Sequence, residues 1–180
     1  MLTGGSFGFA LVAASLLAAP ATGQVRLSQE QALRLAFPEP AVIERRTAFL
    51  GEAPLARARQ LAGPGVEITQ GVVTYYVARR DGRHVGTAYF DAHRVRSLRE
   101  VLMIVVDPAD RVERIEVLAF QEPPEYLPPA GWLDQLDGRL LDDDLSLRRG
   151  IVGMTGATLS AEAVVRATRR VLALHQVIRP

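Results

Sequence analysis

Three hydroxyl side chains stand close together near the C-terminal end of the chain, in the run Thr155-Gly156-Ala157-Thr158-Leu159-Ser160. Gly156 allows a sharp backbone turn, because glycine adopts conformations that are closed to other residues. Such a turn would present the Thr158 hydroxyl outward, at a predicted helix that begins near Ser160. The first N–H groups of that helix and the positive end of its dipole favour a bound phosphate at this place.

The same six residues are compatible with an ordinary helix N-cap that follows a strand. Serine and threonine are favoured capping residues, and a Gly-Ala pair needs no special reason before a helix. The position of the run favours the phosphate interpretation, because the run follows two predicted hairpins and leads into the C-terminal amphipathic helix.

The run resembles the Ser/Thr-Gly-Ala-Thr-x-Ser/Thr motif of the FMN-binding domain family, which is found in Rnf- and Nqr-type electron-transport subunits and related exported flavoproteins. The resemblance extends from about Tyr75 to His175. It implies that a separate flavin transferase esterifies the hydroxyl of Thr158 to the phosphate of FMN. The cofactor-binding residues that it implies around this attachment are Thr155, Gly156, Ala157, Leu159 and Ser160.

The chain differs from the family pattern at two places. Many members have an acidic residue three positions before the first hydroxyl of the motif, where this chain has Val152, and Glu122-Pro123-Pro124-Glu125-Tyr126 replaces the usual Glu-Thr-Pro-Gly segment. Because a flavin ring needs apolar walls and a few polar contacts, Tyr126 and Trp132 are candidates for the walls. Glu122 is the candidate for hydrogen bonds near the ribityl chain or the ring. The alternative for the two aromatic residues is a hydrophobic plug that closes the end of the sheet.

The composition excludes several kinds of chemistry. All 21 basic residues are arginine, so the chain has no lysine for a Schiff base or a phosphate loop. It also has no cysteine for an iron–sulfur cluster, an attached haem or a thiolate zinc site. The net charge of +1 gives no argument for nucleic acid as a partner. Redox work would therefore use a cofactor held in another way, such as flavin.

Residues 1–24 predict an export signal. Phe7 to Ala19 is apolar and too short to span a bilayer comfortably, and Ala19-Pro20-Ala21 or Ala21-Thr22-Gly23 offers a cleavage site. No arginine precedes the apolar run, so the terminal amine is its only preceding positive charge. The alternatives are an uncleaved anchor and a buried core helix. We expect export to the periplasm or to the outer face of the cytoplasmic membrane.

Two hairpins are predicted in the middle of the chain. Val72–Arg79 and His84–Phe90 flank Asp81-Gly82, which is a strong hairpin turn signal. Leu98–Val106 and Arg111–Phe120 flank a second turn at residues 107–110. Successive hairpins favour an antiparallel sheet over a parallel nucleotide-binding sheet.

The flanking segments predict helices and one further strand. Ser28 begins a capping box and a short helix that should end before Pro38, Val42–Leu50 is a candidate strand, and Leu55–Ala62 is a helix that Gly63-Pro64 closes. Apolar residues recur at helical spacing from Val164 to His175, and this face should dock on the sheet. A helical turn is expected at residues 132–136.

The predicted fold is a single α+β domain in which a C-terminal helix packs on an antiparallel sheet of two hairpins. Residues 25–65 form an N-terminal helical and strand extension, and residues 66–180 form the FMN-binding domain. The most plausible joint between them is Gly63-Pro64-Gly65.

Other polar groups carry weaker signals. The run Asp142-Asp143-Asp144 matches no calcium loop and predicts a solvated acidic turn. The histidines at positions 84, 93 and 175 show no ligand spacing, and His175 is expected to cap or pack the terminal helix.

The favoured function is an exported electron carrier with FMN on Thr158 and a membrane-bound or periplasmic redox partner. One alternative is a flavin-free binding or assembly module of a respiratory complex, which Val152 and the altered segment at Glu122 favour. A flavin enzyme, such as a reductase component, is a weaker alternative, because no substrate pocket is legible in the sequence.

Overall fold

The computed structural model describes residues 24–180. The predicted export signal therefore lies outside the described residues, apart from Gln24. None of the helices between residues 24 and 180 combines the length and the apolar character that crossing a bilayer requires.

Both predicted hairpins are present in the structure. The first joins β3 (Val72–Arg80) and β4 (Arg83–Arg94), and its turn residues Asp81 and Gly82 both have positive φ angles, 51° and 75°. This is the geometry of the tight turns that match the twist of antiparallel strands. The second hairpin joins β5 (Arg99–Val106) and β6 (Val112–Phe120).

The two hairpins form the centre of a six-stranded antiparallel sheet with the order β1-β6-β5-β4-β3-β2. The outer strands come from the N-terminal segment. The two-residue strand β1 (Gln24–Val25) pairs with β6, and β2 (Val42–Phe49) pairs with β3 along its whole length. The segment at residues 25–65 is therefore built into the same sheet as the remainder of the chain.

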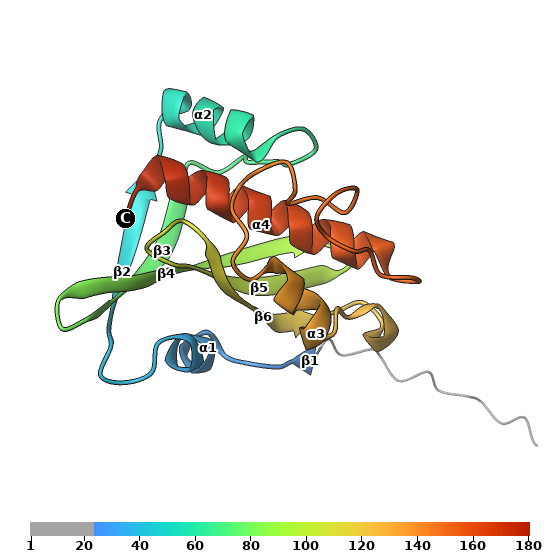
Figure 1. Cartoon of the computed structure of the whole chain (residues 1–180), viewed down its shortest axis with the longest axis horizontal. Coiled ribbons are helices and arrows are strands. Elements are labelled where there is room, and N and C mark those ends of the chain that lie inside the picture. The colour runs from blue at the N-terminus through green and yellow to red at the C-terminus, as the bar shows by residue number, and fades with distance from the viewer. Residues whose placement is uncertain (1–23) are drawn as a thin grey trace, which may run out of the picture.

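The helices lie in layers on the two faces of the sheet (Figure 1). The long helix α4 (Thr158–Ile178) crosses one face, and α2 (Glu52–Ala62) lies on the outer side of α4. On the opposite face lies α1 (Gln29–Ala36), whose capping box at Ser28 is formed as the sequence predicts. The α+β fold with a C-terminal helix on the sheet is thus confirmed.

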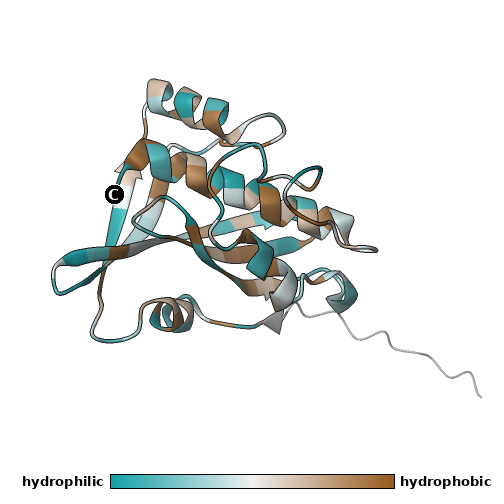
Figure 2. Cartoon of the chain, in the orientation of Figure 1, coloured by the Kyte–Doolittle hydropathy of each residue, from teal (hydrophilic) through white to brown (hydrophobic). Residues whose placement is uncertain are grey.

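The largest core cluster lies between α4 and the sheet. Apolar side chains of α4 such as Val164, Val171 and Leu172 meet Leu102 and Ile104 of β5 there. Figure 2 shows the corresponding alternation of apolar and polar bands along α4. A second cluster lies between α1 and the other face of the sheet.

A winding segment connects β6 to α4. It contains the short 3-10 helices η1 (Pro124–Tyr126) and η2 (Asp134–Leu136) and, between them, the one-turn helix α3 (Ala130–Leu133). The helical turn that the sequence predicts at residues 132–136 is divided between α3 and η2. This segment and its continuation to residue 157 position the motif at the start of α4.

Candidate functional site

The hydroxyl motif occupies the start of α4. The helix begins at Thr158, two residues before the expected start, and its N-cap residue is Ala157, which makes no side-chain capping hydrogen bond. The residues before the motif form bends and turns. The ordinary N-cap after a strand therefore does not describe this site, because no hydroxyl caps the helix and no strand leads into it.

The motif alternates between exposed and anchored residues. Gly156 has a φ of 82°, a conformation that favours glycine. Thr158 is exposed, whereas Ala157 and Ser160 are buried and fix the first turn to the core. The Thr158 hydroxyl donates a long hydrogen bond of 3.4 Å to the Met154 carbonyl oxygen. The turn thus presents this hydroxyl at the surface, as the sequence predicts.

Two side chains hold the backbone just before the motif. The Trp132 Nε1–H donates to the Val152 carbonyl oxygen at 2.7 Å, and the Gln135 side-chain oxygen accepts from the Val152 N–H at 3.0 Å. Trp132 is buried in the main core cluster. It fits the plug alternative rather than an open wall for a flavin ring, because its ring is covered and its N–H is already bonded.

Tyr126 and Glu122 have different surroundings. Tyr126 is half-buried and packs against the main core cluster. A carboxylate oxygen of Glu122 accepts hydrogen bonds from the backbone N–H groups of Arg96, Ser97 and Leu98, at 3.2, 2.8 and 2.8 Å. The bonds from Leu98 and Ser97 lower the pKa of Glu122. Glu122 therefore holds the turn between β4 and β5, and this oxygen is engaged there.

Two apolar side chains in and just before the motif are exposed. Val152 is 72% exposed and Leu159 is 47% exposed. Met154, which lies between them in the sequence, is half-buried. The sequence shows that these residues are apolar, but only the structure shows that Val152 and Leu159 are exposed to solvent.

The phosphate and the ring of FMN make different demands on the residues around Thr158. The phosphate end fits, because an exposed hydroxyl stands at the N-terminus of a 21-residue helix whose first turn has no side-chain cap. For the ring, the predicted wall from Trp132 does not fit, whereas Val152 and Leu159 offer exposed apolar surface. The residues that would hold FMN at its phosphate end are thus Thr158 and the first-turn backbone of α4.

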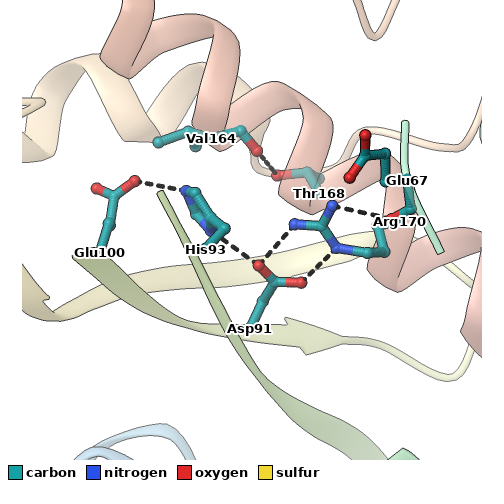
Figure 3. A network of polar contacts seen from close by, with 7 residues as sticks. All are labelled: Glu67, Asp91, His93, Glu100, Val164, Thr168 and Arg170. Atoms are coloured by element: carbon teal, nitrogen blue, oxygen red, sulfur yellow. Dashed lines mark hydrogen bonds and ion pairs between the residues drawn. The ribbon is translucent and has the colours of Figure 1, made fainter. Parts of the chain in front are cut away.

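A buried ionic network lies under the middle of α4 and was not predicted from the sequence (Figure 3). His93 bridges two carboxylates, with its Nδ1 2.8 Å from Asp91 and its Nε2 2.9 Å from Glu100. Arg170 of α4 makes a bidentate ion pair with Asp91, at 2.7 and 2.8 Å. Glu100 is fully buried, and its second oxygen has no hydrogen-bond partner among the described residues.

The network determines the charge of His93. Burial disfavours the charged ring, but the hydrogen bonds from the ring to Asp91 and Glu100 outweigh burial and raise the pKa of His93 to about 8. The pKa of Asp91 is lowered, because the contacts with Arg170 and His93 exceed the opposing effect of burial. His93 is therefore mostly protonated at neutral pH.

His175 packs instead of capping the helix. Its ring is buried between the Tyr89 hydroxyl, at 3.0 Å from Nδ1, and the Asp110 carboxylate, at 3.1 Å from Nε2. Burial lowers the pKa of His175, so the favourable cation at the helix C-terminus is not its main role. In the acidic turn, Asp143 and Asp144 are exposed, as the sequence predicts.

The comparisons with known proteins add no family to this description. No protein-family model matches the chain, and neither a curated protein nor a solved structure matches it.

Proposed function

We propose that this chain is an exported flavoprotein domain that carries FMN as a phosphoester on Thr158 and transfers electrons outside the cytoplasm. The observation that carries the proposal is the presentation of Thr158. It is the exposed first residue of a long helix, only Ala157 separates it from the turn at Gly156, and the helix has no side-chain cap. A hydroxyl in this position is accessible to a modifying enzyme, and the helix start favours the negative charge of a phosphoester.

Thr158 supplies the oxygen of the ester. Its Oγ–P bond forms as the bond between the flavin phosphate and the nucleotide leaving group of a flavin dinucleotide breaks. The hydroxyl proton passes to a base of the separate flavin transferase. Thr158 is then a tether and takes no part in the redox step.

Flavin supplies the electron transfer, because it accepts one or two electrons and can link two-electron donors to one-electron partners. The chain's contribution is to fix the attachment and to leave the ring near the surface. Buried Ala157 and Ser160 anchor the first turn of α4, and Leu159, next to Thr158, is an exposed apolar side chain. This arrangement suits a carrier whose redox partner approaches from solvent.

A second candidate is a flavin-free binding or assembly module of a respiratory complex. The observations that favour it are specific. Trp132 belongs to the core, Glu122 holds the β4–β5 turn, and Val152 occupies the position at which family members often have an acidic residue. In this function the exposed apolar residues beside Thr158 would contact a protein partner.

The intact mass of the exported protein distinguishes the two candidates. The full chain would be produced in a host with an active flavin transferase, alongside Thr158→Ala and the control Thr47→Ala, which removes an exposed hydroxyl on β2. We expect a mass increase of one ester-linked FMN that is absent only from Thr158→Ala. An unmodified wild-type chain, in cells where the transferase modifies a known substrate, would reject the carrier and favour the module.

A further inference from the structure

The sheet is divided between β3 and β4. These two strands pair from Arg80 and Arg83 at the turn as far as Tyr75 and Tyr89, and no farther. Beyond that point Val72–Thr74 pair only with β2, and Phe90–Arg94 pair only with β5. Figure 1 shows the start of β3 turning away with β2 while β4 continues beside β5. Two strand edges therefore diverge inside one sheet.

The diverging edges open onto a cleft of about 1020 Å³, and both unpaired segments line it. Alternate residues of a strand direct their N–H and C=O groups toward each neighbour. The side of β4 that faces away from β5 thus offers a row of backbone groups to the cleft over five residues, 90–94. An open strand edge of this kind is a template for pairing with another extended segment.

The two faces of the cleft differ in chemistry. Toward α4 its walls include the small or apolar side chains of Ala163, Val171 and Leu174, beside the charged side chains of Arg166 and Arg170 of the same helix. On that side Arg170 pairs with Asp91 of β4 and donates to the carbonyl oxygen of Glu67, in the segment before β3, at 3.2 Å (Figure 3).

Three further arginines line the opposite face, together with apolar side chains such as Phe90. Arg94 and Arg99 are direct cross-strand partners, and both line the cleft. Arg45 of β2 lines it as well. Its cross-strand partner is Tyr76, whose side chain packs on the face of the sheet that α1 covers. Like charges directly opposite each other destabilise a sheet. Within residues 24–180, none of these three guanidinium groups makes an ion pair. The acidic residues that line the cleft are Glu67 and Asp91, both beside Arg170.

We propose that this cleft binds an extended segment of a partner protein, in which acidic and apolar residues alternate, by pairing it with the open edge of β4. In a paired strand, successive side chains point to opposite faces. Acidic side chains at every second position would then meet Arg45, Arg94 and Arg99, and the intervening apolar side chains would meet the α4 side. The proposal does not depend on flavin at Thr158.

A labelled hexapeptide of alternating glutamate and valine tests the proposal by fluorescence anisotropy with the purified full chain. We expect saturable binding that is absent for a lysine–valine hexapeptide and strongly weakened when every backbone N–H of the acidic peptide is methylated. Hydrogen exchange should show that the alternate amides within Phe90–Arg94 that face away from β5 become protected when the acidic peptide binds.

Two charge-matched double variants locate the site. Arg94→Gln with Arg99→Gln should weaken peptide binding about tenfold, because two exposed ion pairs contribute about 0.5 to 1 kcal/mol each. Arg80→Gln with Arg83→Gln removes another directly opposed arginine pair, at the far end of β3 and β4 outside the cleft, and should leave binding within about twofold of wild type.

Three outcomes would overturn the proposal. The first is no saturable binding of the acidic peptide at millimolar concentration. The second is equal binding of the methylated peptide, which would indicate a site for free anions and not for a strand. The third is an equal loss of binding in both double variants.

Discussion

The stability of this protein should fall as the pH rises from 6.5 to 9, because His93 loses its proton in that range. The folded chain raises the pKa of His93 from 6.5 to about 8. A group whose pKa is higher in the folded state stabilises the fold fully below its unfolded pKa, and that stabilisation is lost as the pH passes the folded pKa. The contribution of His93 is therefore complete near pH 6.5 and lost above pH 8.

The size of the effect follows from the same two pKa values. One unit of pKa corresponds to about 1.4 kcal/mol, so the free energy of unfolding should fall by about 2 kcal/mol between pH 6.5 and 9. The side chain of His93 is only 12% exposed, so solvent screens its ion pairs weakly. His175 acts in the opposite direction, because its pKa is lowered in the fold and the stability that it adds with rising pH levels off about one pH unit above its unfolded pKa of 6.5. The chain has no cysteine that would titrate in this range.

Urea unfolding at a series of pH values measures the free energy of unfolding, and NMR titration of the His93 ring measures its pKa. Glu100→Gln keeps an oxygen that can accept from the His93 Nε2–H but removes one negative charge, so the pKa of His93 and the loss of stability should both decrease. Glu116→Gln on β6 is the control, because it removes a partly exposed carboxylate that pairs with Arg114 and not with His93. A wild-type His93 that titrates near 6.5, or equal pH slopes in wild type and Glu100→Gln, would refute the reasoning.

Three substitutions test how the motif and its supports are held. Gly156→Ala should lower the free energy of unfolding in urea by about 1 to 2 kcal/mol, because alanine is strained at a φ of 82° even though the space around the glycine is open. Gly131→Ala is the control, because this glycine also has open space but no positive φ, and it should leave the free energy of unfolding unchanged. Trp132→Phe should cost about 1 kcal/mol through the lost bond to Val152, as circular dichroism during unfolding would show. Glu122→Gln should destabilise the β4–β5 turn at pH 7 and accelerate its hydrogen exchange. This difference from wild type should disappear in acid, because the pKa of Glu122 is lowered in the fold and its stabilisation is lost as the pH falls through that value.

The elements that short segments encode could be predicted from the sequence. The turn at Asp81-Gly82 and the capping box at Ser28 depend on residues within a few positions of each other, and both formed as expected. The end of α1 before Pro38 is local in the same way, because proline restricts the preceding residues. The α4 helix was predictable because its apolar residues repeat along many turns.

The contacts that depend on register could not be predicted in the same way. His93 and Glu100 face each other because β4 and β5 join through a four-residue connection at residues 95–98, which sets them directly opposite. The pairing of His93 with Glu100 could have been predicted from the sequence, but only by treating β4 and β5 as a third hairpin. The role of Glu122 was less accessible, because its N–H partners at residues 96–98 lie more than 20 positions earlier in the chain.

The division of the sheet has a mechanical consequence. Strands β2 and β3 form a ribbon that is joined to the remaining strands only from Tyr75 to the hairpin turn. Near its other end the Arg170 guanidinium contacts Asp91 of β4 and the backbone of Glu67, in the segment that precedes β3. At this end the ribbon therefore depends on helix packing and not on strand pairing, because Leu50 and Val73 pack against the cluster that contains Ala173 and Leu174 of α4.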